Sequence, residues 1–335
     1  MANILTLGEI MLRLSTPVGN RLNDSQSLAV HYGGGEANVA ISLANYGHEV
    51  YFASKVPKNA LGKAVSQHLK KYNVRTDYLV QGGQRLGTYY MENGSGPRGA
   101  TVTYDRAHSS FAEMNELTWS LDGLFDGIDL FHISGITPAL STVWEKQTGL
   151  LVQHAKQAGC KISFDCNFRG NLWTQKQAGL VFKRLLPYVD YCSAGPLDAK
   201  YLFDIPTAPE SEDTLTYYYQ KLHELFPNIE YFYSTKRTIF SANHHQLQGN
   251  LWWSEGMATS RLYEITSIID RVGAGDAFAG GLLHGLLTGE SLQSAIEFAT
   301  GAAVMKHTIH GDCNQFTATE VAQFVKTADS GKIIR

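Results

Sequence analysis

The chain has 335 residues, enough for one large α/β domain with an insertion or for two domains. Its 44% hydrophobic and 18% charged residues are typical of globular proteins, which argues against general disorder and predicts a packed core. The formal net charge is −3 and no block of Lys and Arg occurs, which argues against a nucleic-acid partner but leaves small anionic ligands open.

The predicted elements along the chain are short apolar strands that alternate with amphipathic helices. This alternation favours a parallel sheet with helices on both faces, and ligands of such sheets gather at the carboxyl ends of the strands. The last third is predicted to be helical, and the tail after Asp329 is expected to be frayed. The predicted strands are 4–7, 50–53, 130–133, 161–164 and 188–192, and the predicted helices are 36–46, 61–71, 143–158, 175–186, 275–287, 292–307 and 318–328.

Residues 87–107 interrupt this alternation. Their sequence, GTYYMENGSGPRGATVTYDRA, has two β-rich runs around a turn of Gly, Pro and Asn, and therefore predicts a hairpin. The polar segment 12–30 lacks a helical period and is expected to join the hairpin in a small added sheet. We predict a β-rich lid built from residues 12–32 and 86–108.

The cysteines and the N-terminus indicate the cellular setting. Cys160, Cys166, Cys192 and Cys313 are scattered, without a Cys-x-x-Cys pair or a histidine at metal-ligand spacing, so a zinc site is not expected. Cys160 and Cys192 are interpreted as small buried residues of a reduced protein. Neither a signal peptide nor an apolar run of membrane-spanning length is recognisable, so we expect a cytoplasmic protein without a membrane partner.

The sequence Asp270-Arg-Val-Gly-Ala-Gly-Asp-Ala-Phe278 precedes a helical pattern. Gly273 and Gly275 allow a tight turn whose N–H groups point, with the helix dipole, toward one place, and such a place can hold a phosphoryl group. Asp276 could accept a proton from an attacking hydroxyl, and a magnesium ion would relieve its repulsion from phosphate. On spacing alone, a helix N-cap at Asp276 after a plain turn is an equally good reading.

A second glycine-rich element, Gly33-Gly34-Gly35-Glu36-Ala37-Asn38, also precedes a predicted helix. Its glycines would allow close approach by a ligand, and Asn38 offers both a donor and an acceptor from the first turn. A flexible helix start is the more common reading of such a pattern. Neither element fits the dinucleotide fingerprint, and no P-loop pattern occurs anywhere in the chain.

Together the two elements resemble those of the ribokinase-type (pfkB) carbohydrate kinases. That family shows GG-x-x-x-N-x-A near the N-terminus and D-x-x-GAGD-x-F in the last third, which residues 34–40 and 270–278 match. The resemblance covers almost the whole chain. It implies a single ribokinase-like domain over residues 1–335, with three layers (α/β/α), a mostly parallel central sheet and a small β lid. It also implies ATP and Mg²⁺, with K⁺ or another monovalent cation in some members, and a homodimer through the lid.

The resemblance also implies roles for individual residues. Gly273, Ala274, Gly275 and Asp276 would form the anion hole, with Asp276 as the catalytic base. Gly34, Gly35, Asn38 and Asp270 would contact the sugar, and Gly311 would belong to a loop on the nucleotide side.

Narrower features resemble 2-keto-3-deoxygluconate kinases, namely residues 131–141, 104–109 and 165–169. By this resemblance the lid supplies Tyr89, Tyr104 and Arg106, and a strand end supplies Asn167 on the nucleotide side and Arg169 on the sugar side. A guanidinium suits the carboxylate of a sugar acid, whereas neutral sugars need none. The alternatives are a surface ion pair of Arg106 with Asp105 and a structural role for Arg169.

Two stretches depart from the family pattern. Where many members have N-x-x-E, this chain has Gly195-Pro-Leu-Asp198, so a magnesium contact through water is assigned to the shorter Asp198. Where the family has T-x-G-x-x-G, this chain has Ser234-Thr-Lys-Arg-Thr-Ile239, so Ser234, Lys236 and Arg237 are assigned to the nucleotide.

The function expected from the sequence is ATP-dependent phosphorylation of 2-keto-3-deoxygluconate to its 6-phosphate. The rivals are a kinase of fructose or another neutral sugar, and a non-catalytic sugar-binding regulator. Gluconate-derived and galactonate-derived keto acids differ at one stereocentre, and the sequence does not separate them.

Overall fold

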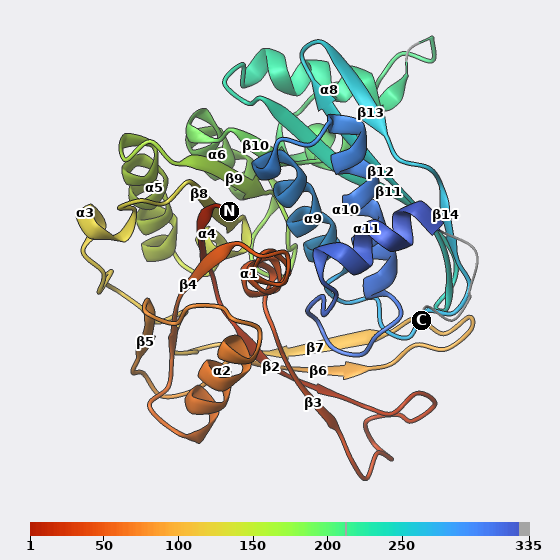
Figure 1. Cartoon of the computed structure of the whole chain (residues 1–335). Coiled ribbons are helices and arrows are strands. Elements are labelled where there is room, and N and C mark those ends of the chain that lie inside the picture. The colour runs from red at the N-terminus through yellow and green to blue at the C-terminus, as the bar shows by residue number, and fades with distance from the viewer. Residues whose placement is uncertain (212, 328–335) are drawn as a thin grey trace.

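The computed structural model describes residues 1–211 and 213–327, and its centre is a sheet of ten strands (Figure 1). Neighbouring strands from β5 through β11 run parallel, whereas β12 is antiparallel to its three partners. The mostly parallel sheet predicted from the sequence is therefore confirmed. In spatial order the strands are β13 (Gly256–Thr259), β12 (His244–Trp253), β11 (Tyr231–Ser241), β10 (Tyr191–Ser193), β9 (Lys161–Asp165), β8 (Leu130–Ser134), β1 (Asn3–Leu7), β4 (Glu49–Val56) and β5 (Leu79–Gln81), and β14 (Tyr263–Ile265) pairs with β12.

Helices cover both faces of the central sheet. One face carries α5 (Thr142–Gln157), α6 (Gln175–Leu185), α7 (Pro196–Leu202) and α8 (Thr214–Leu225), and the other carries α1 (Gly35–Asn45), α2 (Ala60–Lys71), α9 (Ala274–Thr288) and α10 (Leu292–Lys306), with α11 (Ala318–Thr327) packed on α10. The short helices α3 (Leu121–Leu124) and α4 (Ile136–Ala139) flank β8 in the chain.

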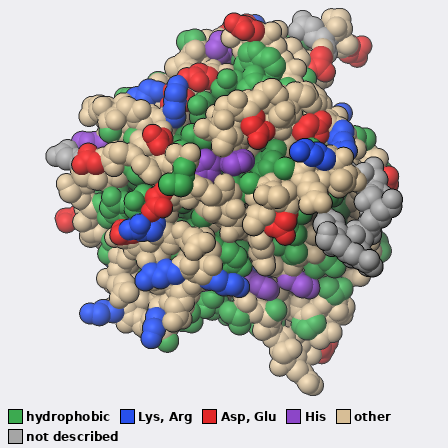
Figure 2. Space-filling view, in the orientation of Figure 1, with side chains coloured by type: hydrophobic (Ala, Val, Ile, Leu, Met, Phe, Trp, Pro, Cys, Tyr) green, Lys and Arg blue, Asp and Glu red, His purple; other side chains and the backbone are tan. Residues whose placement is uncertain are grey.

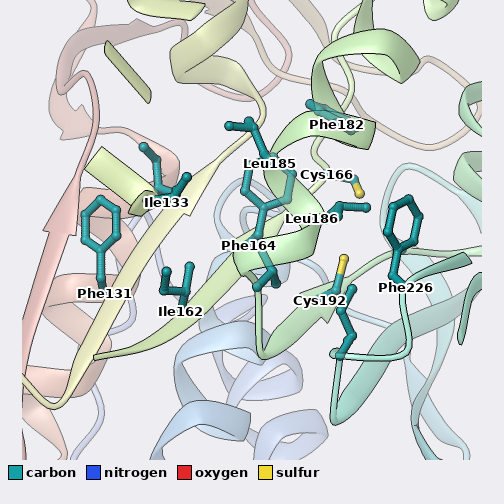
Figure 3. Close-up of a cluster of buried hydrophobic side chains, with 14 of the residues drawn as sticks. Phe131, Ile133, Ile162, Phe164, Cys166, Phe182, Leu185, Leu186, Cys192 and Phe226 are labelled. Carbon is teal, nitrogen blue, oxygen red and sulfur yellow. The ribbon is translucent and has the colours of Figure 1, made fainter. Parts of the chain in front are cut away.

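Two separate cores follow from the alternation of strand side chains between the faces. Leu5 and Phe131 pack under α5 and α6, whereas Ile4 and Leu130 pack under α1 and α9. Figure 3 shows part of the first core, where Phe131 and Ile133 of β8 lie beside Ile162 of β9, and Phe164 lies between these residues and the side chains of α6. Because the inner strands are buried on both faces, apolar residues stand at successive positions and the sequences do not simply alternate between apolar and polar residues.

A second sheet of four strands lies at the bottom of the view in Figure 1. Its order is β3 (Ala29–Gly33), β2 (Met11–Ser15), β6 (Thr88–Glu92) and β7 (Thr101–Asp105), so the predicted segments 12–32 and 86–108 do form one small sheet, and the predicted hairpin is the β6–β7 pair. The hairpin tip reaches the turn after β11, where the Ala242 amide donates to the Gly96 carbonyl at 2.7 Å.

The structure differs from the predicted elements in several places. The strand predicted at 188–192 is shorter, because Pro187 lies in a 3₁₀ turn, η1 (Leu186–Tyr188), that comes before β10. The antiparallel strands β11 to β14 were not predicted. The last predicted helix ends at Thr327, and residue 328 and the tail beyond it lie outside the described residues.

Three further features of the structure concern the cysteines, the length of the apolar helices and the charges on the surface. All four cysteines are buried and free, as interpreted for Cys160 and Cys192. Among residues 1–211 and 213–327, no helix combines the length and the apolar character needed to span a bilayer. Charged side chains of both signs are scattered over the face shown in Figure 2.

Candidate active site

A cavity of about 300 Å³ lies between the carboxyl ends of the parallel strands, the starts of α1 and α9, and the small sheet. Segments more than 200 residues apart in the chain meet there. The predicted site residues in its lining are Gly34, Gly35, Asn38, Tyr89, Tyr104, Arg106, Asn167, Arg169, Gly273, Gly275 and Asp276.

The anion loop, residues 273–276, turns sharply into α9. Gly273 has a φ of +78°, and a Cβ at this position would lie 1.6 Å from the Asp312 carbonyl oxygen, so only glycine fits. An added Cβ at Gly275 would meet nothing within 4 Å, which leaves open space beside the loop. The amides of Gly275 and Asp276 belong to the first helical turn, whose N–H groups lack helical partners. Ala274 is fully buried and does not line the cavity.

The Asp276 carboxylate is held toward the cavity by α1. Its Oδ2 accepts a hydrogen bond from Asn38 Nδ2 at 2.7 Å, and the side chain is half-buried. Burial raises the pKa of Asp276 to about 6, although the Asn38 hydrogen bond and the Arg169 charge oppose the shift. The N-cap of α9 is Gly273, so the alternative reading of Asp276 as the cap does not hold. A carboxyl group with a pKa near neutrality is suited to general base catalysis.

The end of β9 supplies a second polar group of the cavity. Asp165 Oδ1 accepts the Asn167 amide at 3.2 Å, and Asn167 has a φ of +37°, a left-handed conformation that asparagine tolerates better than most residues. Burial and the charge of Asp276 raise the pKa of Asp165 to about 7. The sequence motif contained Asp165, but no role was predicted for it. Arg169 is exposed, and its guanidinium donates only to the Phe168 carbonyl among the described residues.

Arg106 is paired with an acid that the sequence did not single out. Its Nε donates to Glu9 Oε2 at 3.0 Å, its Nη2 contacts the same oxygen, and the two side chains are 12% and 3% exposed. The expected surface partner Asp105 bonds instead to Arg85 at 2.7 Å. The Arg106 guanidinium lies 5.9 Å from the Tyr104 ring centre. Since Nη1 of Arg106 has no partner among the described residues, part of its donor capacity faces the cavity.

Asp270 does not line the cavity. Its carboxylate accepts from Arg13 at 2.7 Å, from the Val272 amide at 3.0 Å and from the Gly311 amide at 3.1 Å, so it braces the anion loop from behind. Arg13 also bonds to Asp312 at 2.8 Å, and the nearby carboxylates hold the pKa of Arg13 above its usual value.

This buried cluster joins the small sheet to the anion loop. Tyr89, on β6, donates to Asp312 Oδ2, and Arg13, on β2, is only 1% exposed. Arg13 was given no role from the sequence, and Asp312 was only placed in the loop that the family resemblance assigns to the nucleotide side. No local pattern marks Arg13 as buried, because its apolar neighbours Leu12 and Leu14 lie on the opposite face of the strand.

The remaining residues assigned to the nucleotide or magnesium lie outside this cavity. Asp198 accepts the Gly195 amide at 2.8 Å at the start of α7, and burial raises its pKa. Ser234 accepts from Tyr219 at 2.6 Å, and Lys236 is exposed. Arg237 is half-buried, and its Nε has no hydrogen-bond partner among the described residues.

The comparisons with known proteins identify relatives over nearly the whole chain. The model of the pfkB family carbohydrate kinases matches residues 1–318. A 2-dehydro-3-deoxygalactonokinase of Haloferax volcanii is 32% identical over 98% of both chains. The crystal structure of a 2-dehydro-3-deoxygluconokinase of Thermotoga maritima is 36% identical, with a TM-score of 0.94 over 98% of this chain and 100% of that one.

A more distant structure, a fructokinase of Xylella fastidiosa with bound ATP, is 18% identical and has a TM-score of 0.77 over 97% of this chain and 98% of that one, which supports the fold alone. The family match and the two closer relatives extend over nearly the full length, so the ribokinase-like fold expected from the sequence is confirmed. The chain belongs to the pfkB family of carbohydrate kinases.

Proposed function

We propose that the chain transfers the γ-phosphoryl group of ATP to the terminal hydroxyl of 2-keto-3-deoxygluconate (2-dehydro-3-deoxygluconate), forming the 6-phosphate. The observation that carries this proposal is one cavity with the Asp276 carboxylate at a helix start and the guanidinium groups of Arg106 and Arg169 in its lining. The names of the relatives from Haloferax volcanii and Thermotoga maritima point to the same class of sugar acids.

In the proposed reaction, Asp276 accepts the proton of the sugar hydroxyl as that oxygen bonds to phosphorus and the bond from phosphorus to ADP breaks. Asn38 fixes the orientation of the carboxylate through its 2.7 Å hydrogen bond. The amides of the 273–276 loop stabilise the charge on the transferring group, because they are already oriented before the reaction starts.

Arg106 and Arg169 would together bind the substrate carboxylate. Glu9 neutralises much of Arg106, which leaves Nη1 to bind one oxygen. Arg169 has most of its donors available, since within residues 1–211 and 213–327 its guanidinium donates only to a neighbouring carbonyl. Gly35 keeps the floor of the cavity open, because an added Cβ would lie 3.6 Å from Asn167 and 3.8 Å from Asp276.

A second group of cationic side chains is proposed to bind the nucleotide. Burial and the charge of Arg271 lower the pKa of Arg237, and Arg237 Nε is buried without a partner in the described ranges. Two neighbouring guanidinium groups repel each other unless an anion lies between them, and a triphosphate is such an anion. ATP would supply the phosphoryl group, and we assign Arg237 and Lys236 to its phosphates.

Magnesium is proposed to bind chiefly through phosphate oxygens and water. Burial and the negative charges of Asp276 and Asp198 raise the pKa of Asp165, and a cation bound nearby would lower it. No group of three acid, His or Cys side chains among the described residues is arranged to hold a metal ion directly. That finding fits Mg²⁺, which keeps several waters and needs few protein ligands.

The small sheet is proposed to act as the lid. Tyr89, Val102 and Tyr104 form one wall of the cavity, and closure of this wall would exclude water, a competing acceptor. β7 is an edge strand with exposed residues throughout, so it could also pair with a second copy of the chain. The homodimer stays a prediction, which sedimentation velocity checks.

A panel of acceptors tests the proposed function. ADP release with Mg·ATP would be measured with the gluconate-derived keto acid, the galactonate-derived keto acid and fructose, and the expected order of kcat/KM places both acids above fructose. A preference for fructose would favour the neutral-sugar kinase. Sugar binding without ADP release from any acceptor would favour the non-catalytic regulator.

A further inference from the structure

Lys306, the last residue of α10, is a buried cation that the proposed reaction does not use. Its side chain is fully buried, and its Nζ lies 3.3 Å from the Asp270 carbonyl oxygen and 3.4 Å from that of Ile309. It forms no salt bridge with a carboxylate among residues 1–211 and 213–327. Lysine is almost never fully buried without a paired acid, because loss of hydration penalises the charge.

Some of the groups around Lys306 favour its charged form, and others disfavour it. Burial lowers its pKa, and the charge of Arg13 acts in the same direction, whereas the charges of Asp270 and Asp312 oppose the shift. Arg13 and Lys306 together balance these two acids, so the cluster is close to neutral. The distances to the carbonyl oxygens are longer than those of ordinary hydrogen bonds, and the contact is therefore mainly an attraction between an ion and two dipoles.

The two carbonyl groups belong to the two chain segments whose packing fixes the position of the anion loop. Asp270 directly precedes residues 271–276, and Ile309 directly precedes residues 310–312. These loops pack tightly, since a Cβ at Gly273 would lie 1.6 Å from the Asp312 carbonyl oxygen and the Gly311 amide donates to Asp270. Lys306 therefore lies where a shift of either loop would move Gly273.

We propose that Lys306 is a positioning residue whose ammonium group serves as a built-in monovalent cation, holding the Asp270 and Ile309 carbonyl oxygens together and thereby fixing the 273–276 loop. Backbone carbonyl oxygens bind K⁺ and similar ions by replacing their water, and an ammonium ion is of comparable size and charge. Because this cation is covalently attached, turnover should not depend on added K⁺. The inference rests on the proposed phosphoryl transfer.

Two variants separate charge from packing. Lys306→Met keeps most of the side-chain volume without the charge, and Lys306→Ala leaves a space that a small cation can enter. We expect kcat to fall about 100-fold in both, the cost of disturbing an anion hole, with smaller changes in KM. Ammonium, methylammonium or K⁺ should restore about tenfold or more of the loss in Lys306→Ala, while Lys306→Met, whose side chain fills the space, should not respond.

Wild-type protein and an exposed lysine serve as controls. Lys326→Met, near the end of α11, should leave kcat and its cation dependence unchanged. Wild-type turnover should stay constant when K⁺ and ammonium are replaced by a bulky organic cation. A wild type that needs K⁺, a fully active Lys306→Met, or equal salt effects on both variants would each overturn the proposal.

Stability measurements keep the test independent of activity. The melting temperature of Lys306→Ala should rise with ammonium or K⁺, and that of Lys306→Met should not. A wild type without ADP release from any acceptor would refute the proposed function, whereas the melting curves would still decide whether a cation binds in place of Lys306. If neither variant folds even with these ions present, the role of Lys306 is general packing and the proposal fails.

Discussion

Asn38→Ala should move the pH dependence of turnover toward higher pH. The substitution removes the 2.7 Å hydrogen bond to Asp276, and this bond lowers a pKa that burial raises to about 6. A hydrogen bond to a charged group is worth about 1.5–3 kcal/mol, and one pKa unit corresponds to about 1.4 kcal/mol. Because Asp276 is half-buried, water replaces part of the bond, and we expect a rise of about one unit.

The assay is the pH profile of kcat/KM for the keto acid at saturating Mg·ATP. A base must be deprotonated to act, so activity falls as the pH drops through its pKa, and a higher pKa shifts this acidic limb upward. ATP titrates identically with every variant, so only the difference from wild type is interpreted. Asn45→Ala is the matched control, since Asn45 lies on the same helix but donates to the Asn314 carbonyl at 2.9 Å. An unshifted limb in an active Asn38→Ala protein would refute the assignment of Asp276 as the titrating base.

Three further substitutions test the surroundings of the anion loop. Gly273→Ala combines a left-handed φ with a clash at the Asp312 carbonyl, and we expect kcat to fall about 100-fold or more. Glu9→Gln frees Arg106, which should lower KM for a sugar acid about fivefold and leave fructose unaffected. Arg13→Met leaves two buried carboxylates unpaired, which should lower the free energy of unfolding in urea by about 3–5 kcal/mol.

Two of these substitutions have a control variant within the chain, and the third compares two kinds of sugar. Gly289→Ala carries a similar φ of +71° without a clash, so it should lose some stability while kcat is unchanged. Equal effects of Glu9→Gln on acid and neutral sugars would contradict its role in selecting charge. Arg75→Met removes an exposed arginine and should destabilise the protein far less than Arg13→Met. If Arg13→Met unfolds like wild type, the buried cluster does not brace the loop.

Local patterns marked several of the residues that line the cavity. The glycines near Asp276 and Asn38 were recognisable because each glycine-rich element precedes a helix at a place where the backbone needs room. Such a pattern is visible in a few consecutive residues. The strands β1 and β8 were recognisable because burial on both faces places apolar residues at successive positions, such as Ile4 and Leu5 in β1 and Leu130 and Phe131 in β8.

The charged partners were not predictable in the same way. Arg13 and Asp312 are 299 residues apart, and Arg106 and Glu9 are 97 apart, so no local spacing relates them. Asp270 was expected beside the sugar because its motif is contiguous with the anion loop, yet its carboxylate points away into the Arg13 pair. Which side of a loop a carboxylate faces depends on the elements packed behind it, here β2 and the loop after α10.

Asp276→Asn gives the most direct test of phosphoryl transfer at this cavity. Turnover with Mg·ATP and binding of the keto acid, followed by calorimetry, would be compared with wild type on the same preparation. We expect kcat to fall about 100- to 10,000-fold, the usual contribution of a general base, while the dissociation constant of the sugar acid stays nearly the same. A variant that keeps its turnover, or that loses sugar binding and turnover in equal proportion, would contradict the role of Asp276 as the base.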